Sequence, residues 1–113
     1  MSSTIQTINP YTNKVLKTYN AITSSQIKSV LKTSNERFQS WKQTSIKERC
    51  RLLKTLAQIL EDNKMGYAKQ VTLEMGKPIQ QSIAEIEKCI TLCDFYTTNA
   101  EDFLSDELIE TEA

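Results

Sequence analysis

Residues 72–89 read TLEMGKPIQQSIAEIEKC, and this stretch holds one of the two glycines and one of the two prolines of the chain. Glycine commonly follows the last residue of a helix, because it adopts a left-handed backbone at no steric cost. Proline suits the first turn of a helix, where its missing N–H is not needed. Gly76 and Pro78 therefore predict a corner between two helices.

Lys77 is the candidate functional residue of this corner. A glycine beside a lysine suggests a phosphate-binding loop, but the chain contains neither GxGxxG nor GxxxxGK(S/T). A catalytic lysine needs a pKa lowered by burial or by cationic neighbours, whereas Lys77 is expected at the surface beside Glu74. We expect the Lys77 ammonium to meet the last carbonyls of the preceding helix.

Downstream of the corner, the apolar pattern predicts one long helix from about Pro78 to Phe103. One stripe alternates spacings of four and three, apart from a gap at Thr97, which is typical of a helix-packing seam. It comprises Ile79, Ile83, Ile86, Ile90, Cys93 and Ala100. A second apolar stripe comprises Leu92, Tyr96 and Phe103. Because both stripes need covering, we expect this helix to have two packing partners.

Upstream of the corner, the sequence predicts further helices. The first begins at a capping box formed by Thr23 and Gln26, and ends at Trp41, which we expect to anchor it in the core. A second capping box, Ser45 with Glu48, begins the next helix, whose broad apolar face contains Ile46, Leu52, Leu53, Leu56, Ile59 and Leu60. Asn63 is expected to cap its end. A shorter helix, roughly 64–75, is weakened by Gly66.

The N-terminal segment has a different character. Two β-prone segments flank turn-forming residues at 9–13, which predicts a hairpin over 5–20. An isolated hairpin is marginally stable in water, so it needs a surface to pack on. The predicted fold is mainly α, with this hairpin, three to four helices over 23–103 and an acidic tail over 104–113.

Composition excludes several classes of function. Fourteen basic and fourteen acidic residues cancel, so nothing indicates binding to nucleic acid or to an anionic membrane. No apolar run is long enough to span a bilayer, and the first residues lack the features of a signal peptide. The chain has no histidine, the commonest general base and metal ligand. We expect a cytoplasmic protein.

The three cysteines, Cys50, Cys89 and Cys93, are expected to be free thiols in a reducing compartment. Cys89 and Cys93 share a helical face and could supply half of a metal site, but no CxxC or histidine supports one. Cysteine is among the most buried residue types, so the favoured interpretation is that both fill the core.

Two further groups of charged residues are candidate sites. Glu85 and Glu87 lie two apart on the long helix and do not face each other, so a paired-carboxylate site is unsupported. We expect both to be solvated, with Glu85 paired to Lys88. Arg49 could anchor a carbonyl or carboxylate, since its guanidinium presents a planar fork; a solvated Arg49 is the favoured interpretation.

The order of these pieces resembles the N-terminal quarter of the aldehyde dehydrogenase superfamily. The family's INP-T hairpin is matched by Ile8, Asn9, Pro10, Tyr11, Thr12 and Asn13. Its later motifs are matched by Phe38 and Trp41; by Glu48, Arg49, Leu52, Leu53, Leu56, Ala57 and Leu60; by Glu74, Gly76, Lys77, Pro78, Ala84, Glu85 and Ile86; and by Phe95 and Tyr96. The stretch 72–89, CDFY and NAEDFLSDELIETEA look most like the bacterial succinate-semialdehyde dehydrogenases.

The resemblance implies an incomplete piece of the α/β aldehyde dehydrogenase fold over 1–113, belonging to the domain that binds the cofactor. Complete members oxidise an aldehyde to the acid with NAD or NADP through a cysteine thiolate, and a homo-oligomer is expected. The family's catalytic and cofactor-binding residues lie downstream, so no catalytic, cofactor-binding or metal-ligating residue is assigned within 1–113. By position, Lys88, Thr91 and Leu92 are expected near the substrate tunnel.

We therefore expect this chain alone to bind no cofactor, to be inactive as a dehydrogenase and to fold weakly. Two alternatives stay open. One is a stand-alone helical module that presents its spare apolar stripe to a partner. The other is a cysteine-based metal binder.

Overall fold

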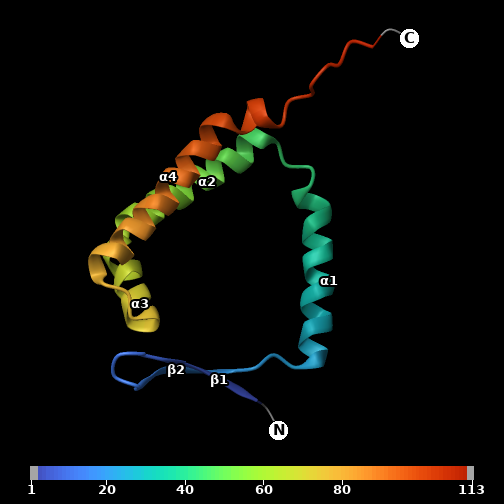
Figure 1. Cartoon of the computed structure of the whole chain (residues 1–113). Helices are drawn as coiled ribbons and strands as arrows, with labels where there is room; N and C mark the ends of the chain where they lie inside the picture. Colours follow the sequence, from blue (N-terminus) through green and yellow to red (C-terminus); the bar gives the residue numbers. More distant parts are fainter. Residues whose placement is uncertain (1–2, 112–113) are drawn as a thin grey trace.

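The computed structural model describes residues 3–111, in which two strands precede four helices along the chain (Figure 1). The elements are β1 (Thr4–Ile8), β2 (Val15–Asn20), α1 (Ser24–Trp41), α2 (Ile46–Asp62), α3 (Lys64–Met75) and α4 (Ile79–Phe103). This confirms the predicted mainly α fold with an N-terminal hairpin. None of the helices in the described residues is both long and apolar enough to cross a membrane.

The hairpin is built by its turn chemistry. The strands β1 and β2 are antiparallel, with Thr4 opposite Asn20 and a register shift between Thr7 and Ile8. The side-chain Oδ1 of Asn9 accepts hydrogen bonds from the backbone N–H groups of Tyr11 and Thr12, at 2.8 and 3.2 Å. Asn13 adopts a left-handed φ of 56°, which asparagine tolerates better than most residues. The predicted turn residues therefore have identifiable roles.

The two predicted capping boxes differ in the structure. At α1 the box is complete, because Thr23 Oγ1 accepts the Gln26 N–H at 3.3 Å and Gln26 Oε1 accepts the Thr23 N–H at 2.8 Å. At α2, Ser45 Oγ accepts the Glu48 N–H at 3.1 Å, but the Glu48 carboxylate accepts from Arg51 instead. The Arg51 hydrogen bond lowers the pKa of Glu48. The second capping box was therefore only half right.

The core lies where α2 and α4 run side by side and α3 packs against the start of α4 (Figure 1). Its buried residues are Ala57, Ala68, Ser82, Ile86 and Cys93. All of these except Ile86 have small side chains, which favours close packing of the helices. The α4 seam is confirmed at its middle, whereas Ile79, at the first turn, is 37% exposed.

Large parts of the apolar surface have no cover. On α2, half of the predicted apolar face is exposed, namely Leu52, Leu56 and Ile59. The second α4 stripe is exposed as well, and comprises Leu92, Tyr96 and Phe103. In the acidic tail, Leu108 is 94% exposed. The expected two packing partners of α4 are α2 and α3, but they leave its second stripe exposed.

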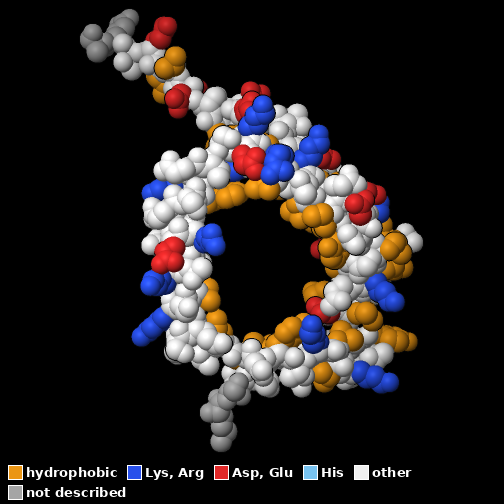
Figure 2. All heavy atoms as spheres, turned by 180° about the vertical axis from the view of Figure 1, so that it is seen from behind, with side chains coloured by type: hydrophobic (Ala, Val, Ile, Leu, Met, Phe, Trp, Pro, Cys, Tyr) orange, Lys and Arg blue, Asp and Glu red, His pale blue; other side chains and the backbone are white. Residues whose placement is uncertain are grey.

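The chain encloses an opening. The hairpin and α1 form one side of a ring, with α2, α3 and α4 on the other, and hydrophobic side chains gather along the inner rim (Figure 2). The Cα radius of gyration is 20.2 Å, against about 13 Å for a compact domain of this length. No described residue of α1 is buried. Trp41 is 46% exposed, so the prediction that it anchors a core is wrong for this chain.

Candidate functional site

The α3–α4 corner forms as the sequence predicts. Gly76 has φ 68° and ψ 14°, and its N–H donates to the Thr72 carbonyl at 3.0 Å, which ends α3. Pro78 has φ −56° and ψ 138° and precedes the first residue of α4, so it caps that helix and does not lie inside its first turn. The Gln81 and Ser82 N–H groups donate to its carbonyl at 2.9 and 3.1 Å. The corner therefore ends α3 and begins α4 with backbone hydrogen bonds from Gly76 and to Pro78.

Lys77 has a different partner from the one expected. Its Nζ donates to the Glu85 carboxylate on α4, and not to the carbonyl end of α3. Glu85 therefore pairs with Lys77 and not with the expected Lys88. The Glu74 carboxylate accepts a hydrogen bond from Gln70 Nε2 at 2.5 Å. The two side chains of the Lys77–Glu85 pair are 36% and 48% exposed. Lys77 lacks the burial that a catalytic lysine requires, so the corner is structural in character.

Two contacts at this corner were not predicted from the sequence. The hydroxyls of Thr72 and Ser82 lie 3.0 Å apart and join α3 to α4, with Ser82 fully buried. Pro10, at the tip of the hairpin, lies against Gly76 so closely that a Cβ on Gly76 would be 3.0 Å from Pro10 Cγ. The hairpin tip therefore touches the corner and closes the ring. No local pattern links residues so far apart in sequence.

The cysteines do not converge on one site. All three are free; Cys93 is buried, Cys50 is half-buried and Cys89 is exposed. The core-filling interpretation is right for Cys93 and wrong for Cys89. Burial raises the pKa of the Cys93 thiol, with a smaller contribution from the neighbouring Cys89. Across residues 3–111, no cluster of three or more cysteine, aspartate or glutamate side chains could hold a metal ion.

Glu85 and Glu87 serve separate ion pairs, which agrees with the expectation that they form no carboxylate pair. Lys64 Nζ bridges Glu61 of α2 at 2.9 Å and Glu87 of α4 at 3.1 Å. These hydrogen bonds raise the pKa of Lys64. Both glutamates are half exposed, so their role is to link helices at the surface.

Arg49 is an anchor, and the favoured interpretation that it is solvated was wrong. Its Nη2 donates to the Trp41 carbonyl at 3.1 Å and its Nε donates to Thr44 Oγ1 at 2.9 Å. The guanidinium carbon also lies 5.3 Å from the centre of the Trp41 ring. The side chain thus joins the start of α2 to the end of α1.

The residues expected near a substrate tunnel lie on the uncovered side of α4. Lys88 and Thr91 are exposed, and Leu92 is 47% exposed. The Thr91 hydroxyl donates to the Glu87 carbonyl at 3.0 Å. Their placement near a tunnel stays a prediction.

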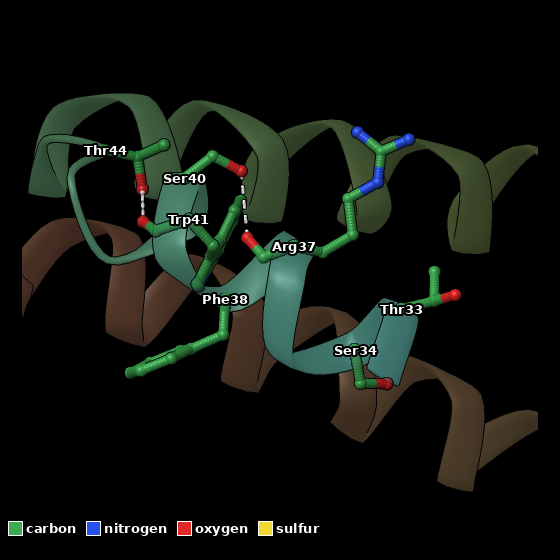
Figure 3. A pocket seen from close by; sticks show the side chains of 7 residues that line it. All are labelled: Thr33, Ser34, Arg37, Phe38, Ser40, Trp41 and Thr44. Carbon is green, nitrogen blue, oxygen red and sulfur yellow. Dashed lines mark hydrogen bonds between the residues drawn. The ribbon is translucent and has the colours of Figure 1, made fainter. Parts of the chain in front are cut away.

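A hollow of about 550 Å³ lies at the end of α1 (Figure 3). Its lining residues are Thr33, Ser34, Arg37, Phe38, Ser40, Trp41 and Thr44. Two of its hydroxyls already donate to backbone carbonyls, Ser40 to Arg37 at 2.9 Å and Thr44 to Trp41 at 2.6 Å. Five of the seven lining residues are polar, four of them with hydroxyl groups, and the lining includes no carboxylate, cysteine or lysine side chain.

Comparison with known proteins gives the geometry a context. The chain matches the pattern of the aldehyde dehydrogenase family over residues 1–113. It is 39% identical over 109 residues to a probable NADP(+)-dependent succinate-semialdehyde dehydrogenase of Synechocystis, covering 96% of this chain and 24% of that protein. It is 37% identical over 103 residues to succinate-semialdehyde dehydrogenase 1, also NADP(+)-dependent, of Mycobacterium bovis, covering 91% and 22%.

A solved structure agrees with these relatives. Glyceraldehyde-3-phosphate dehydrogenase GapN of Methanocaldococcus jannaschii, crystallised with NADP, superposes with a TM-score of 0.87 at 25% identity, covering 99% of this chain and 24% of that one. The chain thus spans about a quarter of the length of the proteins it matches. The match over every residue, together with the shared fold, shows that this chain belongs to the aldehyde dehydrogenase family.

Proposed function

We propose that this chain forms the first part of an NADP(+)-dependent dehydrogenase that oxidises succinate semialdehyde to succinate. The observation that carries the proposal is the 39% identity to the Synechocystis relative, which extends over 96% of this chain. In the proposed reaction, the aldehyde and water yield the acid, and a hydride reduces NADP(+) to NADPH.

The proposed role of residues 1–113 is to provide scaffold. The exposed apolar stripe of α4 and the apolar rim of the ring are surfaces that require cover. In the proposed enzyme, the remainder of the dehydrogenase fold packs against them. We assign no catalytic or cofactor-binding residue to this segment, and we place Lys88, Thr91 and Leu92 near the substrate. The free thiols support a reducing compartment such as the cytoplasm, and the family resemblance supports a homo-oligomer.

A chimaera tests the scaffold role. In this chimaera, residues 1–113 of this chain replace the matching first quarter of the Synechocystis relative. NADPH formation from succinate semialdehyde is then measured. We expect an active enzyme, while neither the truncated relative nor the 113-residue chain alone should produce NADPH. A chimaera that folds but leaves succinate semialdehyde unoxidised would contradict the proposal, as would NADPH formation by the chain alone.

The exposed apolar surface also suits the second candidate, a stand-alone helical interaction module. The reading frame beyond Ala113 separates the two. Continuation into Pro-Trp-Asn and later Gly-Gln-x-Cys segments supports the dehydrogenase, whereas a stop codon supports the module. For the isolated chain, strong binding of a hydrophobic dye supports the scaffold, because its apolar surface would lack the cover that a finished domain has. A cooperative thermal transition without dye binding supports the module.

A further inference from the structure

The orientation of α1 is not explained by helix packing. In the described part of the chain, no side chain of α1 is buried. Only residues 42–45 separate it from α2. A helix of this length is about 27 Å long, so a change of about 10° at its end moves its far end by about 5 Å. Whatever holds the end of α1 therefore controls where the hairpin lies.

Arg49 makes three contacts with the connection between α1 and α2. It donates to the carbonyl of Trp41, the last residue of α1, and to the hydroxyl of Thr44 in the connecting segment. The Thr44 hydroxyl in turn donates to the same Trp41 carbonyl at 2.6 Å. The guanidinium plane is also within cation–π distance of the Trp41 ring. One side chain therefore engages the backbone, the linker and the terminal ring of α1.

The charge at this point suits the helix end. The C-terminus of a helix carries a partial negative charge, which attracts a cation. Arg51 is bound to the Glu48 carboxylate at 2.7 Å, whereas no described residue forms an ion pair with Arg49. The Arg49 guanidinium is thus available to the carbonyl and the ring. A lysine could not replace it, because an ammonium lacks the planar fork and the stacking surface.

We propose that Arg49 is a positioning residue that sets the angle between α1 and α2, and through α1 the width of the ring. This role requires no ligand and no catalysis, so its test in the 113-residue chain does not depend on the proposed dehydrogenase function. The hairpin and α1 together form one side of the ring, and the Pro10–Gly76 contact fixes the other end of that side, where the hairpin meets the corner. This side is therefore held at two places, and Arg49 holds the end where α1 connects to α2.

Spin-label distances in the 113-residue chain test this proposal. In a background with Cys50, Cys89 and Cys93 replaced by alanine, labels are attached at Lys28→Cys on α1 and Lys54→Cys on α2, both at exposed positions. The distribution of distances between the two labels is measured by pulsed electron paramagnetic resonance. We expect a single narrow distribution in this parent.

Four substitutions in this background decide the outcome. Arg49→Met, Arg49→Lys and Thr44→Val should broaden the distribution or shift its centre by several ångströms, with helix content by circular dichroism unchanged. Thr44→Val keeps the charge, so it separates the joint from a general effect of removing a cation. Arg51→Met, which removes a cation two residues away, should leave the distribution unchanged. A distribution equally broad in the parent, or one unaltered by Arg49→Met, would overturn the proposal.

Discussion

The two glycines of this chain should respond to alanine in opposite directions. Gly76 has φ 68°, a conformation that costs an L-residue with a Cβ about 1–2 kcal/mol. Gly66 lies inside α3 with no atom within 4 Å of a built Cβ. Alanine in a helix interior is favoured over glycine by about 0.8–1.0 kcal/mol. Gly76→Ala should therefore destabilise the helices, and Gly66→Ala should stabilise them.

The loss at Gly76 has two parts. The first is the backbone cost of about 1–2 kcal/mol. The second is a steric contact, because the new Cβ would be 3.0 Å from Pro10 Cγ, whereas the optimum between carbon atoms is about 3.5–4.0 Å. Pro10→Ala removes Cγ and should relieve only the second part. Gly76→Asn retains the Cβ but tolerates the left-handed backbone better, so it should relieve part of the first.

Urea unfolding followed by far-ultraviolet circular dichroism measures both effects in the 113-residue chain. The free energy of unfolding is compared among the four variants and the double variant Gly76→Ala with Pro10→Ala. We expect Gly76→Ala to lower the free energy of unfolding less in the Pro10→Ala background than in the parent, so that the two substitutions are coupled. If Gly76→Ala is as stable as the parent, the assignment of the corner is wrong. If the coupling is zero, the hairpin tip does not rest on the corner.

Four further predictions use the same assay or a simple chemical one. Ser82→Val should destabilise the chain by about 1–3 kcal/mol, because Ser82 is fully buried between helices. Ile86→Ala should cost about 2–5 kcal/mol, whereas Leu92→Ala, at a residue 47% exposed, should change stability by less than about 0.5 kcal/mol. Iodoacetamide should label Cys89 before Cys93, since burial raises the pKa of the Cys93 thiol above its ordinary 9.0. That raised pKa stabilises the fold below about pH 9, and the contribution is lost as pH rises through the higher folded value; Cys93→Ala should abolish this dependence.

Local chemistry explains what could be predicted. Gly76 and Pro78 end and begin helices through their own backbone preferences, and Thr23 with Gln26 satisfies the first N–H groups of α1 within four residues. Such interactions involve neighbours in sequence, so a single sequence contains them. The family resemblance rests on the same local motifs, and the match over residues 1–113 confirms it.

Partners that meet through the folded chain could not be predicted. Lys77 pairs with Glu85, eight residues further along the chain, and this pairing follows from the conformation of the corner and of the first turns of α4. Arg49 reaches the Trp41 carbonyl and ring only because the linker returns α2 toward the end of α1. The exposed Trp41 shows the same limit, since an aromatic residue at a helix end looks alike in sequence whether or not a neighbour covers it.

The sequence by itself determined the order and ends of the helices, the hairpin turn and the family. The tertiary structure decided which apolar stripe is covered: Ile86 is 8% exposed, while Leu92, six residues along the same helix, is 47% exposed. Periodicity shows that a face is apolar, but burial also depends on what lies opposite. Hydrophobic stabilisation is proportional to the area removed from water, so it arises only where a second element is present to exclude that water.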